Sequence, residues 1–266
     1  MADAAHLSET PFSDLPLAQP LQAALAEIGF THCTPIQAQT LPKLIAGRDI
    51  AGQAQTGTGK TAAFLLATIN RLLSHEPEPI REGFTCAPRA LIVAPTRELA
   101  IQIEKDAATL LKQVDLSLMV VFGGTGYESQ REELRAGVDI LVGTPGRLID
   151  YFKQKAYTLD RAEAVVLDEA DRMFDLGFLK DIRYLLRKLP EPQKRLNMLF
   201  SATLSHRVLE LAYEHMNDPE LVRVEAETVT ADRVRQTMVH VSKDDKIALL
   251  IGWLRQHDPH RTMVFI

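Results

Sequence analysis

The chain has 266 residues, of which 46% are hydrophobic and 24% charged, so it resembles an ordinary globular protein and is too long for one small core. A net charge of −5 excludes a generally basic coat for nucleic acid, which must then bind through a local surface. No apolar run approaches the roughly 20 residues of a membrane span. Cys33 and Cys86 lack a metal-type spacing and are expected to be unpaired thiols in a reducing cytosol, which predicts a cytoplasmic protein.

The N-terminal segment is predicted to contain a tail and two helices. Residues 1–11 are small and polar and are expected to form a flexible tail. Leucines at helical spacing predict a first helix over Pro16–Ile28, which Gly29 ends. A second helix is predicted over Pro35–Leu44, with Thr34 as its N-cap.

Strands and helices then alternate through the middle of the chain. Strands are expected at Asp49–Gln53, Arg89–Pro95, Leu116–Phe122, Val138–Val142, Ala164–Leu167, Leu196–Phe200 and Leu221–Val224. Helices are expected at Thr61–Leu73, Arg97–Val114, Tyr127–Arg135, Gly146–Phe152, Phe178–Leu189 and Ser205–Met216. This alternation predicts an α/β fold with a mainly parallel sheet and helices on both faces. Ligands of such sheets bind outside the carboxyl ends of the strands.

The C-terminal segment differs in composition. Residues 225–235 are polar and without periodicity, and we expect a linker there. A strand at Thr237–Val241, a helix containing Ile247 and Leu254, and an apolar stretch at Thr262–Ile266 follow. We therefore expect one domain over residues 12–224 and only the beginning of a second domain over residues 236–266.

A glycine-rich turn between the first strand and the third helix carries the first chemical signal. Glycines there admit backbone angles closed to other residues and let amide groups approach an anion. The following helix N-terminus adds partial positive charge, Lys60 can reach the outer phosphates, and the Thr61 hydroxyl can ligate Mg²⁺. A plain Gly/Thr-rich turn is the alternative. The predicted nucleotide-binding residues are Ala54, Gln55, Thr56, Gly57, Thr58, Gly59, Lys60 and Thr61.

Three carboxylates, Asp168, Glu169 and Asp171, follow a buried strand. A nucleotide hydrolase needs an acid that holds Mg²⁺ and a group that positions the attacking water. Asp168, first out of the strand, suits the metal, and Glu169 suits the water. The alternative, a solvated acidic turn, loses weight because a phosphate loop lies upstream in the same sheet.

With these residues the chain resembles the DEAD-box RNA helicases, because Asp168-Glu169-Ala170-Asp171 spells that family's name. The further matching motifs, in order, are Gly29 to Gln37 (the Q motif), Ala54 to Thr61, Pro95 to Ala100, Gly123-Gly124, Thr144 to Arg147 and Ser201-Ala202-Thr203. The resemblance implies a RecA-like domain of the phosphate-loop NTPase type that uses ATP and Mg²⁺, and a second RecA-like domain after it.

In the Q motif the resemblance places Phe30, Thr34 and Gln37 at the nucleotide. A Gln amide donates and accepts at once, so Gln37 can read the paired donor and acceptor of adenine. A glutamine on the helix surface is the alternative. Phe30 can stack on the base, with a core aromatic as its alternative. Phe12, the isolated upstream aromatic, is expected to pack beneath the pocket.

The resemblance also assigns a coupling role and an RNA surface. Hydroxyls of Ser201 and Thr203 can hydrogen-bond the Asp171 region and link the ATP site to RNA, with a helix cap before Ser205 as the alternative. Helix N-termini, threonine hydroxyls and arginines suit backbone phosphates and read no base sequence. The expected RNA contacts are Pro95, Thr96, Arg97, Gly123, Gly124, Thr144, Pro145, Gly146 and Arg147. Ordinary turns and caps are the alternative.

Within the family the chain is most similar to the bacterial RhlB type, on the strength of Cys33 to Gln37, Gly52 to Thr56 and Arg195 to Ser205. That type works with the endonuclease RNase E in the RNA degradosome, which the resemblance implies as a partner. The arginine motifs of the family's second domain have no counterpart here. We therefore expect an ATP-dependent helicase that opens short RNA duplexes and is largely inactive as this chain alone. An ATP-gated RNA clamp without enzymatic activity and a DNA-directed helicase are the rival functions.

Overall fold

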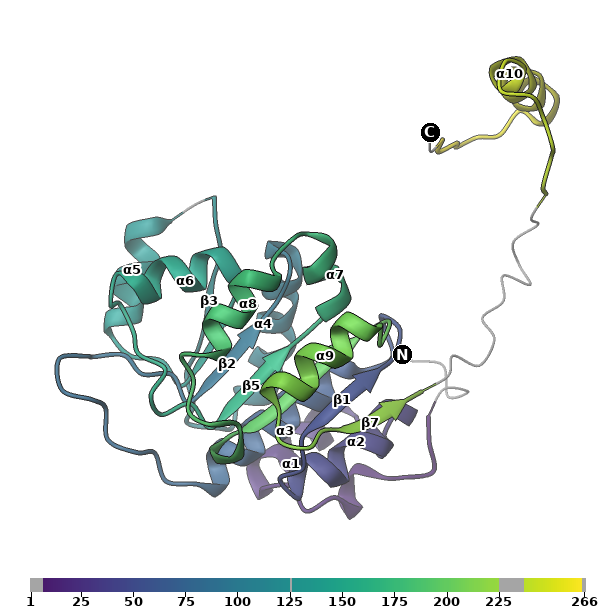
Figure 1. Ribbon diagram of the computed structural model, residues 1–266. Coiled ribbons are helices and arrows are strands. Elements are labelled where there is room, and N and C mark those ends of the chain that lie inside the picture. The colour runs from purple at the N-terminus through teal and green to yellow at the C-terminus, as the bar shows by residue number, and fades with distance from the viewer. Residues whose placement is uncertain (1–6, 125, 225–236, 265–266) are drawn as a thin grey trace. The chain divides into compact units, whose positions relative to one another are not determined.

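The computed structural model describes residues 7–124, 126–224 and 237–264, and the chain divides into two compact units, Met1–Ala226 and Glu227–Ile266. The larger unit contains a seven-stranded sheet in the order β3-β4-β2-β5-β6-β1-β7, with every pairing parallel (Figure 1). Its strands are β1 Ile50–Gln53, β2 Ala90–Val93, β3 Leu118–Val121, β4 Ile140–Gly143, β5 Ala164–Leu167, β6 Leu196–Ser201 and β7 Glu220–Arg223. This confirms the predicted RecA-like α/β fold.

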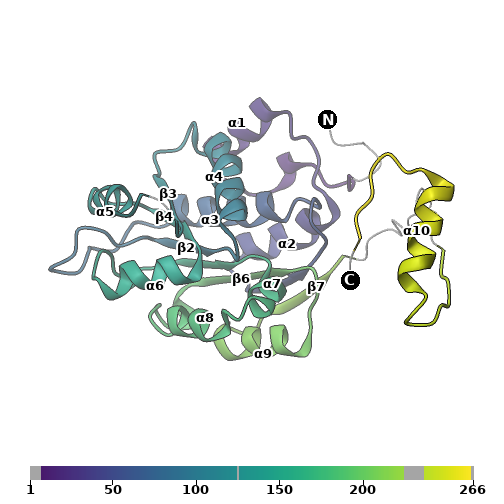
Figure 2. The same cartoon turned by 90° about the horizontal axis from the view of Figure 1, so that it is seen from above.

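Helices cover both faces of the sheet, which Figure 2 shows from above. One face packs against α1 Gln19–Ile28, α2 Pro35–Ile45, α3 Lys60–Ser74 and α4 Arg97–Leu111. The other packs against α5 Tyr127–Arg135, α6 Pro145–Lys153, α7 Ala170–Asp175, α8 Leu179–Leu186 and α9 His206–His215. The strands β2, β4 and β5 are buried along their whole length and, apart from Gly143, consist of Val, Ile, Leu and Ala, as is typical of parallel sheets.

Three helix predictions were wrong in their extent. The helix predicted at Arg97–Val114 ends at Leu111. The first helix begins at Gln19 instead of Pro16, with Pro20 in its first turn. The predicted helix Phe178–Leu189 is shorter, and the unpredicted α7 precedes it across Gly177, which has φ +82°. The positive φ fits glycine and ends α7, because few other residues adopt it without strain.

Part of the predicted tail is bound to the domain. The Ser8 amide donates to the Cys33 carbonyl at 2.8 Å, the Cys33 amide donates to Thr10, and Pro11 forms an antiparallel bridge with His32. Residues 8–11 of the predicted tail are therefore hydrogen-bonded to the segment around Cys33. Cys33 and Cys86 are buried and unpaired, as predicted, and burial raises the pKa of each thiol to about 11.

A buried polar network closes the amino ends of β1 and β6. The Asp49 carboxylate accepts from the Asn197 amide at 2.9 Å, its side chain at 2.7 Å, and the Asn217 amide at 2.6 Å. Arg195 donates to Asn197 Oδ1 at 2.7 Å and to the carbonyls of Pro190 and His215. Burial raises the pKa of Asp49 although these donors and the Arg195 charge oppose it.

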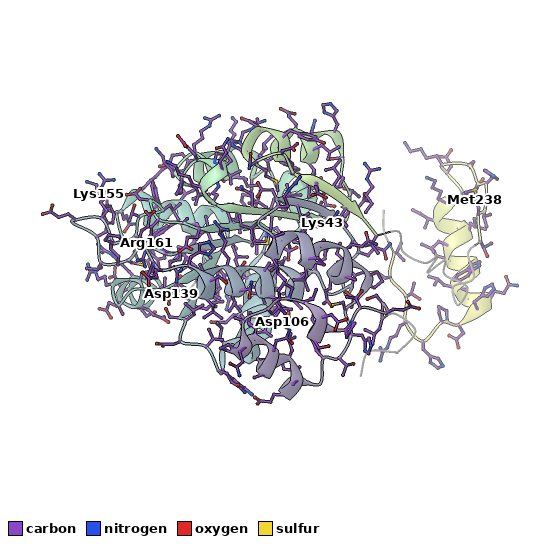
Figure 3. All side chains as sticks on the ribbon, turned by 90° about the horizontal axis from the view of Figure 1, so that it is seen from below. Lys43, Asp106, Asp139, Lys155, Arg161 and Met238 are labelled. Atoms are coloured by element: carbon purple, nitrogen blue, oxygen red, sulfur yellow. The ribbon has the colours of Figure 1, made fainter. Side chains whose placement is uncertain are left out.

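An ion pair, Arg89 with Glu163 at 2.5 Å, lies at the amino ends of β2 and β5. Arg89 also donates to the carbonyls of Leu72 and His75. The sheet edge has an exposed pair as well, where Lys43, labelled in Figure 3, meets Glu220 of β7 at 2.8 Å. The charged side chains at the amino ends of the strands are thus paired with opposite charges or engaged in hydrogen bonds.

The smaller unit contains α10, Lys246–His257, which confirms the helix expected around Ile247 and Leu254. The strand predicted at Thr237–Val241 was wrong, because those residues have no regular structure. The predicted linker at 225–235 lies outside the described residues. No helix in the described parts of the chain is long and apolar enough to cross a membrane.

Candidate functional site

The strand order divides the carboxyl edge of the sheet into two neighbouring halves. The ends of β1, β6 and β5 lie side by side, since Gln53 is in register with Ser201 and Leu167 with Leu199. The ends of β2, β4 and β3 adjoin them, with Gly143 in register with both Val93 and Val121. The phosphate-loop, acidic-motif and Ser201–Thr203 residues lie at or after the ends of the first three strands, whereas the Q-motif residues precede β1; the residues predicted for RNA follow the second three strands. One edge therefore gathers both sets.

The phosphate-loop residues form a tight turn between β1 and α3. Gly57 and Gly59 have φ of +84° and +90°, in the region that favours glycine. The helix begins at Lys60, which is buried and donates from Nζ to the Ala54 carbonyl at 2.8 Å. The Ala54 amide donates to the Ser201 carbonyl at 3.1 Å, which fixes the start of the loop to β6. The loop thus presents backbone amides and an ammonium group at a helix N-terminus.

Gln37 connects the Q motif to this loop. Its side chain is buried, which excludes the alternative of a helix-surface glutamine. The Thr34 amide donates to Gln37 Oε1 at 2.8 Å, and Gln37 Nε2 donates to the Gly59 carbonyl at 3.0 Å. An amide has two donor hydrogens and two acceptor lone pairs, so capacity for a base edge remains. The Thr34 hydroxyl oxygen is buried there without a hydrogen-bond partner.

The two upstream aromatics lie together beside the Q motif. Phe12 is buried and its ring stacks on that of Phe30, with centroids 6.2 Å apart. Phe30 is 44% exposed, so it is not the core aromatic that the alternative required. The Phe30 ring is therefore accessible in part, and the packing role expected of Phe12 agrees with its burial.

The acidic motif begins where β5 ends. Asp168 is 2% exposed, and burial raises the pKa of its carboxyl to about 6, although the Lys60 charge opposes the shift. Glu169 has φ +51°, a strained value for a residue with a side chain, and occupies the N-cap position of α7. Its carboxylate pairs with Arg172 at 3.2 Å. The Lys60 and Asp168 side chains thus bring opposite charges to one buried place.

Asp171 is joined to the residues that follow β6. Its Oδ2 accepts from the Thr203 amide at 2.9 Å and from the Thr203 hydroxyl at 3.0 Å, and its amide donates to Ser201 Oγ at 3.1 Å. Partial burial acts to raise the pKa of Asp171, yet the hydrogen bonds from Ser201 and Thr203 outweigh it and lower the pKa. Ser205 occupies the N-cap position of α9, so neither Ser201 nor Thr203 is the cap residue of the alternative interpretation. The hydrogen bonds expected from the sequence are present.

This donor set fits a nucleotide with a hard divalent cation. The side chains of Asp168 and Thr61 offer oxygen, which Mg²⁺ prefers, and Mg²⁺ commonly keeps several waters and takes few protein ligands. Accordingly, no group of three or more His, Cys, Asp or Glu able to hold an ion occurs among the described residues. A Cβ on Gly59 would lie 2.4 Å from Gln37 Nε2, so the loop depends on the missing side chain. Asp168 and Thr61 can hold the metal, and the loop can hold the phosphates.

The residues predicted for RNA lie at strand-to-helix turns. Thr96 caps α4 by accepting from the Leu99 amide at 3.3 Å, so the simple cap of the alternative is present there. Thr144 precedes α6, whose first residue Pro145 is buried while Gly146 is exposed. Gly123 and Gly124 are exposed at the end of β3, and Arg97 is exposed at the start of α4. The nine residues follow the ends of β2, β3 and β4, and the buried Pro95 and Pro145 can act only through their backbones.

Sequence reasoning missed four side chains around these motifs. Phe122, Tyr127 and Tyr151 contact the predicted RNA arginines, and Arg172 pairs with Glu169. The four-residue spacing of Arg147 and Tyr151 on a predicted helix would have revealed one of these contacts. The spacing of Glu169 and Arg172 carries no such signal, because α7 was not predicted.

The comparisons with known proteins agree with this arrangement. The family model described as DEAD/DEAH box helicase matches residues 34–211. The chain is 55% identical to ATP-dependent RNA helicase RhlB of Pseudoalteromonas atlantica, 56% to that of Idiomarina loihiensis and 58% to that of Xanthomonas oryzae pv. oryzae, each over 98% of this chain. It spans 61%, 60% and 45% of their respective lengths. Because the family model matches more than half of the chain, the chain belongs to the DEAD/DEAH box helicase family.

Proposed function

We propose that this chain is the ATP-binding part of an ATP-dependent RNA helicase that opens short RNA duplexes. The observation that carries the proposal is the division of one sheet edge into two adjoining halves. Lys60, Asp168 and Ser201 lie at or after strand ends of one half, and Thr96 and Arg147 follow strands of the other. A change at bound phosphate can therefore reach bound RNA over a short path.

Each residue near the phosphate loop has a role that its chemistry suits. Lys60 and the loop amides hold the phosphates, and Thr61 and Asp168 hold Mg²⁺, which neutralises charge developing on the transferred phosphoryl group. Glu169 orients the attacking water and accepts its proton. Gln37 recognises the adenine edge, and the partly accessible ring of Phe30 stacks on the base.

Asp171, Ser201 and Thr203 form the proposed connection between the two halves. Their hydrogen bonds tie the start of α7 to the turn after β6. A movement of Glu169 during turnover would thus shift the segment that follows β6. The RNA half then binds the sugar-phosphate backbone without reading sequence, which suits an acidic protein that binds through a local surface.

The remaining parts of the proposal concern the whole protein. The relatives are longer than this chain and are named as RNA helicases. We propose that residues beyond the chain complete the catalytic site with arginines, which in related phosphoryl-transfer enzymes contribute about 10³- to 10⁵-fold in rate. This chain alone would then bind Mg–ATP but hydrolyse it very slowly. A cytoplasmic location and a partnership with RNase E in RNA degradation follow from the RhlB resemblance.

The test is RNA-stimulated ATP hydrolysis by this chain and by the full-length protein, each with and without Glu169→Gln. We expect turnover only in the full-length protein, and Glu169→Gln to lower it by about 10²- to 10⁴-fold, the contribution of a positioned general base. If the full-length protein binds ATP and RNA but never turns over, the RNA clamp replaces the helicase. Stronger competition by DNA than by RNA of equal length would favour a DNA-directed enzyme.

A further inference from the structure

Both arginines predicted to contact RNA lie over aromatic rings. The Arg97 guanidinium carbon is 4.5 Å from the centroid of the Phe122 ring. The Arg147 guanidinium carbon is 5.0 Å from the Tyr127 ring and 5.2 Å from the Tyr151 ring. These distances are within the range of cation–π attraction, about 6 Å.

Other arginines of the same domain are held by carboxylates. Arg89 pairs with Glu163, Arg172 with Glu169, and Arg183 with both Glu210 and Glu214. Within the parts of the chain that the structure describes, the ion pairs include neither Arg97 nor Arg147. A carboxylate fixes a guanidinium but cancels its charge, whereas a ring fixes it and leaves the charge in place. An arginine held by a ring thus remains able to bind an anion.

The rings on either side come from one short segment around the exposed glycines. Phe122 directly follows β3, and Tyr127 is the first residue of α5. Arg97 approaches this segment from the end of β2, and Arg147 approaches it from the end of β4, the two strands that separate β3 from β5. Phe122 and Tyr127 therefore contact arginines from two different motifs.

The Tyr127 ring is itself held in place. It lies 5.3 Å from the Tyr151 ring, and its hydroxyl accepts a hydrogen bond from Gln154 Nε2. The Tyr151 hydroxyl donates to the Tyr127 carbonyl at 2.8 Å and accepts from Arg147 Nη1 at 3.0 Å. Arg147 is thus fixed by a hydrogen bond and by two rings, one of them buried.

We propose that Phe122 and Tyr127 are positioning residues, which hold the Arg97 and Arg147 guanidinium groups oriented and unneutralised for the phosphates of an RNA strand. This inference rests on the proposed function, because it takes RNA as the ligand of that surface. The two rings touch no phosphate themselves. They reduce the side-chain freedom that each arginine would otherwise lose on binding.

The test measures RNA affinity of the full-length protein with a non-hydrolysable ATP analogue at several salt concentrations. Tyr127→Leu and Phe122→Leu should each weaken RNA binding by about 2- to 5-fold, the fold-change that an exposed cation–π contact implies. Tyr127→Phe and Phe122→Tyr keep a ring and should restore binding. The slope of log affinity against log salt should not change in the leucine variants, because both charges remain. Arg147→Gln should reduce that slope by about 0.7, the share of one single-strand phosphate contact.

A double-variant cycle separates positioning from a general packing effect. Tyr127→Leu should weaken RNA binding in the wild-type background but have no effect in an Arg147→Gln background. An equal loss in both backgrounds, or no rescue by Tyr127→Phe, would overturn the role of the ring. Melting temperatures of all variants show whether the fold is intact, and the Tyr127 cycle decides the matter if Phe122→Leu unfolds the domain.

The chain offers a matched control in Phe84, whose ring lies 6.0 Å from the Arg81 guanidinium outside the RNA motifs. Arg81 pairs with Asp160, and Phe84→Leu should leave RNA affinity unchanged. If the wild-type protein binds no RNA, the proposed function fails and this inference with it. If the wild-type binds RNA and the leucine variants bind equally well, only the inference fails.

Discussion

The amino and carboxyl edges of the sheet, where the strands begin and end, each contain an almost fully buried carboxylate. The two carboxylates differ in the number of hydrogen bonds that they accept. At the amino edge, Asp49 is 3% exposed and accepts three hydrogen bonds from Asn197 and Asn217. At the carboxyl edge, Asp168 is 2% exposed and accepts one hydrogen bond from a described residue, the amide of Glu169 at 2.9 Å. One carboxylate is fully engaged by the fold, while the other keeps lone pairs that a bound cation can use.

This difference separates residues that stabilise the fold from residues that bind ligands. A buried charge with complete partners is destabilising to remove, since the partners are left uncompensated. A buried charge with few partners costs free energy in the folded state, and a ligand of opposite charge can offset that cost. Substitutions at the two edges should therefore have opposite effects on stability and on binding.

The largest expected effect on stability comes from Asp49→Ala. It removes one acceptor of the buried Asn197 side chain, the acceptor of the Asn217 amide and the carboxylate charge near Arg195, which should cost about 3–5 kcal/mol of the free energy of unfolding. Urea denaturation measures the loss. Asp168→Ala is the matched control, because that carboxylate is equally buried, and it should change stability by less than about 1 kcal/mol. Equal losses in the two variants would refute the comparison.

Lys60→Ala should show the reverse pattern at the carboxyl edge. Its ammonium meets only the Ala54 carbonyl among the hydrogen bonds of the described residues, so stability should change little. Losing a charged contact to phosphate should weaken Mg–ATP binding by about 1.5–3 kcal/mol, which is about 10- to 150-fold. Titration with a fluorescent ATP analogue checks this value. Lys43→Ala, which removes an exposed ammonium paired with Glu220, should leave the affinity unchanged.

Gly59→Ala tests whether the loop depends on a missing side chain. The residue has φ +90°, which costs about 1–2 kcal/mol for alanine. The added Cβ would also come within 2.4 Å of Gln37 Nε2 and displace the amide from the Gly59 carbonyl. We expect a lower melting temperature together with weaker discrimination of ATP against GTP. Gly47→Ala has a similar φ of +79° with open space around it, so it should lower the melting temperature alone.

Periodicity predicted most of the larger domain because its strands are buried on both faces and its helices are amphipathic. The ranges of α5 and β5 agree at both ends. Prediction from periodicity failed where the local sequence pattern does not determine the structure. Helix α7 is short and begins beside Glu169 in a left-handed conformation, which no period reveals. The stretch 237–241 has a strand pattern, but a strand also needs neighbours to pair with.

The site was predictable in its backbone and less so in its partners. Motif order and strand ends indicated that Asp171, Ser201 and Thr203 would meet, and their hydrogen bonds are present. The contact of Arg97 with Phe122 joins the start of α4 to the residue after β3, so it forms only when the sheet has folded. The same holds for Gln37 and Gly59. Contacts distant in sequence depend on strand order, which the sequence pattern alone did not specify.

The smallest expected effect is on the pH dependence of stability. It concerns His215, which lies beside the network of Asp49, Asn197 and Arg195. Burial lowers the pKa of His215 below 6.5; the charges of Arg195, Arg183 and Arg187 act in the same direction, and Glu214 opposes them.

Because the folded protein binds this proton less readily than the unfolded chain, the His215 contribution to stability is present above about pH 6.5 and is lost as the pH falls toward the folded pKa. His215→Gln should therefore flatten the dependence of melting temperature on pH between about 7 and 5. The exposed His206 at the start of α9 is the control, and His206→Gln should leave the dependence unchanged. A flattening of equal size in both variants would place the pH dependence outside the buried network.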